Sequence, residues 1–523
     1  MSLKPTPVPN GMTSFWRTEP HVLDSHRSTE SLPSECDIVI VGAGYAGASV
    51  AHHIIGQTSP GLKPPSIVIL EARQACSGAT GRNGMITFYD DYIVFTHCNI
   101  INIGGHMKPD IYNGIAGLAA DHGVEAAAEV AAFEAKHVTY LKQLIDNANI
   151  QCDYVVTKAV DVQLSQEHSE KLKDGYDRLI QGGCEPTANA TYIDTPNAEK
   201  VAILSECLNS RTSLTCTQFS GVKGAKGCFT YEAGHIWPYK FVLHLLENAI
   251  AHGVNLQTHT PVSGMTHSTD TSLTHRWTVN TARGSISAKR VVLATNAYTS
   301  SLAPQYKEKI IPVRGTCSRI IVPPNTSAPR LAKTYTLRWN NWNYDYLIPR
   351  DDGSIVVGGA RPAFIDDLDS WYNVSDDSQV LEAVVRYWDN YMQRNFVGWE
   401  ESHAYTDRVW TGSKSFLNDL TFEHNSKIER TNIFTVMGYS SDGLPHVGCV
   451  PGEEEQYILA GFTGHGMPQI FLAAEGLAKM ILNGIDYKQT KLPRLFESTS
   501  ARLESPRNKI FANTPGAKPE ARL

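Results

Sequence analysis

Three glycines near the N-terminus have the spacing of a turn that binds a dinucleotide. The apolar run Cys36–Val41 is typical of a buried parallel strand, and Gly42, Gly44 and Gly47 follow it in the segment GAGYAG. The first glycine of such a turn permits the bend, the second lets the backbone approach a pyrophosphate, and the third lets the helix pack on the strand. Ala46 lies in the same turn, at the start of a helix whose free N–H groups favour an anion.

The acidic residue Glu71 follows the glycine turn at the position where a dinucleotide site requires a carboxylate. The run Ile67–Leu70 predicts a second buried strand, and Glu71 at its end can bind both ribose hydroxyls of an adenosine. A glycine-rich turn without a ligand is the alternative interpretation. The combination of strand, turn, helix and acid favours the dinucleotide site.

A small, polar loop after Glu71 extends the expected site. The residues expected to contact the cofactor here are Ala72, Arg73, Gly78, Ala79, Thr80, Arg82, Asn83 and Gly84. A second close approach of the backbone suits a long cofactor, so the loop favours FAD over NAD. The segment GVKGAKG, at Gly221–Gly227, has the wrong spacing for a second nucleotide site.

The composition limits the classes of protein that fit. A chain of 523 residues, 42% of them hydrophobic, is long enough for about two or three domains with large cores. Its 46 Lys and Arg against 53 Asp and Glu give a net charge of −7, which argues against broad binding to nucleic acid or anionic membranes. The ten cysteines form no CxxC pair, so we expect reduced thiols and neither a disulfide framework nor a metal site. No apolar run is long enough to span a membrane.

Further motifs extend from about Ser14 to Arg502. They are SFWRTEP (Ser14–Pro20), SGATGRNG (Ser77–Gly84), HIWPYK (His235–Lys240), VVLATNAYT (Val291–Thr299), PVRG (Pro312–Gly315), DYLIPRDDGSIVVGGAR (Asp345–Arg361), MGYSSDGLPHVG (Met437–Gly448) and GFTGHGM (Gly461–Met467). In this order, and together with Gly42–Glu71, they resemble the D-amino-acid oxidase superfamily of FAD-dependent oxidoreductases. The resemblance is strongest to the branch of glycine, sarcosine and gamma-glutamylputrescine oxidases, and within it to fungal proteins of unassigned substrate.

The elements that must position these motifs alternate between helices and strands. Helices are predicted at Ala48–Ile55, Tyr112–Asn149 and Pro468–Ile481, and further strands at Asn255–Gln257, Arg290–Ala294, Ile355–Gly358 and Tyr457–Ala460. The expected fold class is α/β, with a Rossmann-like FAD-binding domain plus an α+β substrate domain that has a mainly antiparallel sheet. The expected parts are an N-terminal arm (1–35), a discontinuous FAD-binding domain (36–150, 200–305 and 436–502), a substrate domain (151–199 and 306–435) and a C-terminal tail (503–523).

The resemblance also implies where the cofactor lies. It implies main-chain contacts from Val262 to the adenine, and it adds Ala294, Thr295, Asn296, Gly438, Asp442, Gly464, Gly466 and Met467 to the residues that contact the cofactor. No cysteine stands where some relatives attach FAD through sulfur, so we expect non-covalent FAD. His106 leaves a histidine linkage open, since other relatives link the flavin through an N-terminal histidine.

Four residues are candidates for the catalytic site. His465 is expected beside the flavin, where the N-terminus of the following helix would stabilise the negative charge of the reduced ring; His106 is the second candidate. Trp237 and Tyr239 would share one face of a strand with His235 and form an aromatic wall of the amine site, or else a packed face of the second domain. Two further residues, Arg314 and Arg350, are candidates for holding a substrate carboxylate or for structural ion pairs.

The implied reaction is oxidation of the C–N bond of a small amine or amino acid to an imine, with oxygen as the expected acceptor. An acceptor-coupled amino-acid dehydrogenase is one alternative, and an inactive flavoprotein with a split FAD site is another. We expect a cytoplasmic protein. The C-terminal Ala521-Arg522-Leu523 keeps the peroxisome open, because it is a loose variant of a peroxisomal signal.

Two stretches interrupt motifs that are continuous in the family pattern. Residues 85–104 separate GRNG from Gly105-His106, and residues 413–435 separate WTG (Trp410–Gly412) from Met437. Lineage-specific loops are one interpretation. We favour the other, that both are translated, retained introns, because the genetic code permits splice signals at every edge and both reading frames close, giving GRNGGH and WTGIMGYSSDG. We therefore predict that both inserts lie outside the compact core.

Overall fold

The computed structural model describes residues 5–8, 17, 21–58, 61, 63–82, 105–194, 216–324, 326, 328–340, 343–350, 353–378, 381–410 and 435–512. The first insert and all of the second except Thr435 lie outside these residues. Asn83, Gly84 and the C-terminal tripeptide also lie outside them. Within the described ranges, no helix is long and apolar enough to cross a membrane.

The first of two sheets is mainly parallel and carries the glycine turn. Its strands are β1 (Glu35–Val41), β2 (Ile67–Leu70), β7 (Asn255–Gln257), β8 (Val262–His267), β9 (Trp277–Thr281), β10 (Gly284–Leu293), β17 (His446–Cys449) and β18 (Gln456–Ala460). They follow the order β17-β18-β10-β1-β2-β7, with β9 beside β10 and β8 beside β9. Strand β1 lies between β10 and β2 and is parallel to both. Its residues Ile38–Val41 are buried, as expected for a central parallel strand.

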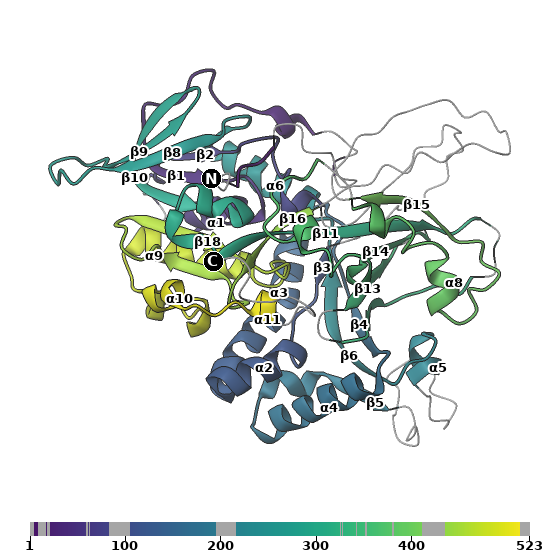
Figure 1. The fold of residues 1–523 in the computed structure, drawn as a ribbon. Helices are drawn as coiled ribbons and strands as arrows, with labels where there is room; N and C mark the ends of the chain where they lie inside the picture. Colours follow the sequence, from purple (N-terminus) through teal and green to yellow (C-terminus); the bar gives the residue numbers. More distant parts are fainter. Residues whose placement is uncertain are drawn as a thin grey trace, which may run out of the picture.

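Three helices pack together beside this sheet: α1 (Tyr45–Gln57), α6 (Pro238–Ala251) and α9 (Ile470–Asn483) (Figure 1). Phe471 of α9 joins them, because its ring contacts Tyr45 of α1 and Phe241 of α6. The other helices are α2 (Asn113–His122), α3 (Val124–Asn147), α4 (Gln166–Gln181), α5 (Cys216–Ser220), α7 (Leu368–Trp371), α8 (Tyr391–Asn395), α10 (Ser500–Glu504) and α11 (Lys509–Ala512).

The second sheet is mainly antiparallel and forms the other half of the molecule (Figure 1). Its strands are β3 (His106–Met107), β4 (Val155–Gln163), β5 (Thr191–Asp194), β6 (Gly227–His235), β11 (Ile310–Ile321), β12 (Thr334–Arg338), β13 (Tyr344–Pro349), β14 (Ile355–Gly359), β15 (Tyr405–Trp410) and β16 (Thr435–Ser440). The order is β15-β11-β14-β13-β12-β4-β6-β3, with β16 beside β11 and β5 beside β6. Only β12 and β4 pair in parallel among the described strands of this sheet.

The predicted fold class is confirmed, with two local corrections. The helix predicted for Tyr112–Asn149 is two helices, because Gly123 adopts a φ of +86° between α2 and α3. Strands β3, β6 and β16 belong to the second sheet, although the expected boundaries place their residues, apart from Thr435, in the FAD-binding domain. We keep the two-domain division as a proposal, with boundaries that follow sheet membership.

Strands β15 and β16 lie end to end along β11, on either side of the second insert. Trp410 pairs with Cys317, and Met437 pairs with Val313. An unbroken strand between these two pairs would need three connecting residues. The predicted spliced sequence supplies three: Thr411, Gly412 and one isoleucine. In the structure, Thr435 and Val436 of β16 instead lie opposite Gly315 and Arg314 of β11.

Candidate active site

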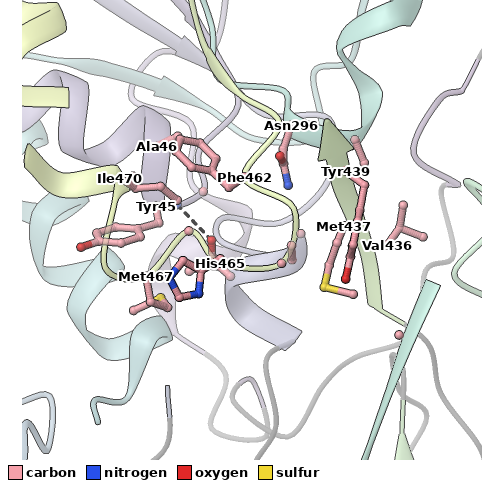
Figure 2. Close-up of a pocket in the computed structure, with 18 of the residues that line it drawn as sticks. Tyr45, Ala46, Asn296, Val436, Met437, Tyr439, Phe462, His465, Met467 and Ile470 are labelled. Atoms are coloured by element: carbon pink, nitrogen blue, oxygen red, sulfur yellow. Dashed lines mark hydrogen bonds between the residues drawn. The ribbon is translucent and has the colours of Figure 1, made fainter. Parts of the chain in front are cut away.

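A pocket of about 550 Å³ connects the glycine turn of the first sheet to one face of the second sheet. From the first sheet and its loops it is lined by Gly42, Gly44, Ala46, Glu71, Ala72, Arg73, Gly78, Ala79, Thr80, Val262, Ala294, Thr295 and Asn296. Gly464, His465, Gly466 and Met467 line it from the turn before α9, across from Met437 and Tyr439 of β16 (Figure 2). The structure therefore brings most of the predicted cofactor and flavin residues to one cavity.

The glycine turn leaves room for a ligand beside Gly44. A Cβ at Gly44 would meet only the Thr80 hydroxyl, 3.6 Å away, among the described residues. At Gly47 a Cβ would overlap the carbonyl oxygen of Gly42, so this glycine packs the helix on the strand and does not line the pocket. These two environments match the division of roles that a dinucleotide turn requires, so the cradle fits a pyrophosphate.

Glu71 is held rigidly at the end of β2. The backbone N–H of Ala43 donates to its Oε2 at 2.9 Å, and that of Arg73 donates to its Oε1 at 3.0 Å. Each carboxylate oxygen has a second lone pair, which remains available to a ribose hydroxyl. The acid therefore fits the predicted contact with the adenosine part of FAD.

Arg82 and Arg73 share one buried carboxylate that the sequence analysis missed. Asp377 pairs with Arg73 at 2.9 Å and also with Arg82, and its side chain is 1% exposed. Burial lowers the pKa of Arg82 to about 10, and Asp377 opposes that shift. Arg73 lines the pocket, whereas Arg82 is absent from its lining. Arg82 therefore belongs to this ion cluster, and the prediction that it contacts the cofactor directly is corrected.

Replacement of Asp377 by asparagine is expected to destabilise the protein by about 3–5 kcal/mol, because it leaves two buried arginines without their counter-charge. Urea unfolding of the FAD-loaded protein measures the loss. Asp376→Asn is the matched control, since the Asp376 carboxylate accepts hydrogen bonds from Ser378 on a more exposed turn. Equal stability of the two variants would show that the cluster has no such role.

Two other predicted cofactor residues lie outside the pocket lining. Asp442 forms an ion pair with Arg502 at 2.7 Å and accepts a hydrogen bond from the Ser440 hydroxyl. Burial acts to raise the pKa of Asp442, but Arg502 outweighs it and the pKa lies below its usual value. A Cβ at Gly438 would clash with Asn296 and with the backbone of Ala297. Both predictions are corrected: Gly438 allows close packing, and Asp442 anchors the C-terminal segment.

The predicted aromatic wall of Trp237 and Tyr239 is wrong. Pro238 starts helix α6, so the alternation expected of a strand stops after His235. Trp237 is fully buried at the N-terminus of that helix, and Tyr239 donates its hydroxyl to Asp24 at 2.6 Å. Neither side chain lines the pocket. Tyr231, earlier on β6, lines it instead.

The second sheet supplies a polar floor to the pocket. The carboxylate of Asp161 on β4 pairs with the Lys108 ammonium and accepts the hydroxyls of Tyr112 at 2.8 Å and Tyr231 at 3.0 Å. Burial acts to raise the pKa of Asp161, but Lys108 and Arg338 outweigh it and set this pKa at about 2. Asp161 is therefore an anion whose charge Lys108 already balances.

The Asp161 charge also raises the pKa of Arg338 at the end of β12, so one carboxylate faces two cations. No carboxylate of the described residues lies within 4 Å of the Arg338 guanidinium, which stacks 4.7 Å from the ring centre of Tyr344. Its Nε is buried and has no hydrogen-bond partner among the described atoms. Arg314 also lines the pocket but donates to the backbone oxygen of Ser370, while Arg350 lies outside the lining. Among these three arginines, Arg338 is the one best placed to take a carboxylate, and Arg314 stays a candidate because it lines the pocket.

His106 and His465 both line the pocket, as predicted. His106 bonds through Nε2 to the Thr334 hydroxyl, and burial holds its pKa well below the usual value. His465 bonds through Nε2 to the carboxylate of Glu134 at 2.7 Å. The two histidines therefore have opposite electrostatic character, the first neutral and the second favouring the charged form.

The fold and the site define a flavin-type oxidoreductase with a dinucleotide cradle and a second, antiparallel sheet over the reaction chamber. The family model of FAD dependent oxidoreductases, DAO, matches residues 37–480, so the chain belongs to this family. FAD is accordingly its cofactor. Gamma-glutamylputrescine oxidoreductase of Escherichia coli is 22% identical over 422 residues, which cover 78% of this chain and 80% of that protein.

Solved structures show the same fold. L-proline dehydrogenase from P. horikoshii has a TM-score of 0.59 and 16% identity, with 89% of this chain and 98% of that chain covered. Glycine oxidase from Bacillus cereus has a TM-score of 0.57 and 12% identity, with 88% and 98% covered. These likenesses support the arrangement of the two sheets.

Proposed function

We propose that this FAD-dependent enzyme oxidises the C–N bond of a small amino acid or amino-acid-like amine, with oxygen as the electron acceptor. The observation that carries the proposal is the continuity of one pocket from the nucleotide cradle to a floor where Arg338 is the second cation beside Asp161. The relatives support it, because the names of the three proteins compared above refer to an amine or an amino acid.

Each part of the chamber has a separate task. The chemistry that FAD would supply when bound is that of a hydride acceptor for the carbon that bears the amine and of an electron donor to oxygen. Gly44 and Glu71 hold the nucleotide part, and the wall formed by Tyr346, Ile348 and Phe364 limits the water around the reacting carbon. The polar floor orients the substrate, so that the chain contributes positioning and desolvation.

Replacement of Arg338 by glutamine is expected to raise KM for an amino acid at least tenfold, with a much smaller change in kcat, because a charge-assisted hydrogen bond to the carboxylate is lost. Initial rates of oxidation measure both constants. An amine substrate without a carboxylate is the control, and its KM should change little. A KM for the amino acid that stays unchanged would remove Arg338 from the substrate site.

The proposed reaction is tested by anaerobic mixing of the FAD-loaded protein with a panel of amines and amino acids. Bleaching of flavin absorbance by at least one of them, followed by reoxidation in air with release of hydrogen peroxide, is expected. Bleaching that is reversed only by an added dye would favour the dehydrogenase alternative. No bleaching by any member of a broad panel would contradict the proposal.

A further inference from the structure

The imidazole of His465 forms an ion pair with Glu134, which lies on a helix far away in the sequence. His465 lies in the turn before α9, and Glu134 lies in the middle of α3. Their side chains meet at 2.7 Å, between Nε2 and Oε2. The Glu134 side chain is 2% exposed, whereas that of His465 is 39% exposed and lines the pocket. In this pair the carboxylate is buried, and the histidine that it binds lines the pocket.

Glu134 is fixed in place by two further donors. The backbone N–H of Asp110 donates to its Oε2 at 2.7 Å, and the Gln469 side chain donates to its Oε1 at 2.6 Å. One turn along α3, His137 accepts the N–H of Leu472 at 3.1 Å. Helix α3 thus holds the beginning of α9 at two points, and the carboxylate has little freedom to turn away from His465.

The polar and titratable groups around His465 come from three segments. Asp110 and Lys108 follow β3, Glu134 and His137 lie on α3, and the neutral amide of Gln469 precedes α9. Burial and Lys108 oppose a charged imidazole, while Glu134 and Asp110 favour it. The outcome is a His465 pKa above its usual value, with Glu134 as the main reason for the rise. The arrangement therefore favours the imidazolium form more than in an unperturbed histidine.

We propose that Glu134 is a positioning residue that keeps His465 protonated and facing the pocket, where its charge stabilises the negative charge that the flavin acquires when it is reduced. The proposal rests on the FAD-dependent reaction inferred above. It requires only that FAD occupies the pocket, and it holds for any substrate. A charge that is already fixed in position stabilises developing charge effectively, because it needs no reorganisation during the reaction.

Sulfite provides a test that does not depend on turnover. It adds to oxidised flavin through a new sulfur–nitrogen bond and leaves a negative charge on the ring, so its affinity reports the stabilisation of that charge. Glu134→Gln should weaken sulfite binding to the FAD-loaded protein at least tenfold at pH 7.5 and leave FAD content unchanged. Glu475→Gln on α9 is the matched control, because Glu475 pairs with Lys479 outside the pocket lining.

The pH dependence separates positioning from a merely structural role. A raised His465 pKa means that the imidazolium persists above the ordinary histidine pKa of about 6.5, so sulfite affinity of the natural protein should fall only beyond that pH. In Glu134→Gln the midpoint should move down by about one pH unit or more. NMR titration of the His465 ring in the FAD-loaded protein should show the same shift.

Two results would overturn the proposal: an unchanged sulfite affinity in Glu134→Gln, or an unchanged pH midpoint. If this variant fails to fold, His465→Gln with Glu134 intact provides the second test, and it should show the same tenfold loss without the pH midpoint that belongs to His465. Failure of the substrate screen would contradict the proposed reaction alone, because the sulfite measurement needs no substrate.

Discussion

Removal of the two inserts is expected to raise the soluble yield several-fold and to bring FAD occupancy close to one per chain. The variant lacks residues 85–104 and 413–435 and carries Val436→Ile. Ordering a chain segment costs about 1–2 kcal/mol per residue in backbone entropy, and a translated intron has no evolved surface to offset that cost. The apolar stretch Ile86–Ile103 is also rich in β-forming residues, which makes it an aggregation hazard.

The register along β11 fixes how many residues must connect β15 to β16. Thr411, Gly412 and the isoleucine that replaces Val436 then connect Trp410 to Met437, so β15 and β16 become one strand without moving either pair. The matched control deletes residues 413–436 and so leaves only two connecting residues. It shifts Met437 by one position and turns the side chains of β16 to the wrong face. Absorbance at 450 nm per chain and the yield of soluble protein compare the two variants.

Two results with the deletion variant would contradict these expectations. If the full chain is yellow and active while the first variant loses flavin or unfolds, the two segments are functional loops and the intron interpretation is wrong. Equal yield and occupancy in the first variant and its control would show that the register argument carries no weight.

Replacement of Gly44 by valine is expected to remove FAD while leaving the fold intact. Gly44 has an extended backbone with φ −85° and ψ −168°, which valine adopts readily, and a Cβ there meets only Thr80 among the described residues. The branched side chain instead fills the space that a pyrophosphate needs. FAD content should fall below about a tenth of the natural level, which corresponds to about 1.4 kcal/mol or more in binding.

Gly47→Val distinguishes loss of the cradle from loss of the fold. Its Cβ would overlap the carbonyl oxygen of Gly42, so α1 and β1 must separate and the protein should be insoluble or strongly destabilised. Circular dichroism and flavin absorbance of both variants test the pair. A yellow Gly44→Val protein would remove Gly44 from the cofactor site.

Local patterns were enough to pick out residues that share one pocket, because the interactions that form a nucleotide turn are local. A turn, a helix start and a strand end each leave a signature within a few residues, as Gly42, Gly44 and Glu71 do. The predicted aromatic wall was wrong because a local pattern was misread. Trp237 and Tyr239 alternate as residues of a strand do, but Pro238 begins a helix. Proline is common at the first position of a helix, so the sequence already contained the signal that contradicts a strand.

The rest of the site depends on contacts between distant segments, which one sequence does not reveal. Asp377 meets Arg73 and Arg82 from about 300 positions away, and Glu134 meets His465 across 331 positions. Arg338 did leave a local trace, since Thr334, Thr336 and Arg338 alternate along one strand and so predict a polar face. Only the sheet order shows that this face lies over the cofactor pocket.

A stoichiometric single turnover without oxygen shows whether FAD in this pocket oxidises a C–N bond. The FAD-loaded protein is mixed with the best substrate of the panel, and the products are identified by mass spectrometry. We expect one carbonyl product and one molecule of ammonia or released amine for each flavin bleached. Bleaching with a product that retains its nitrogen on the same saturated carbon, or release of amine without bleaching, would contradict this expectation.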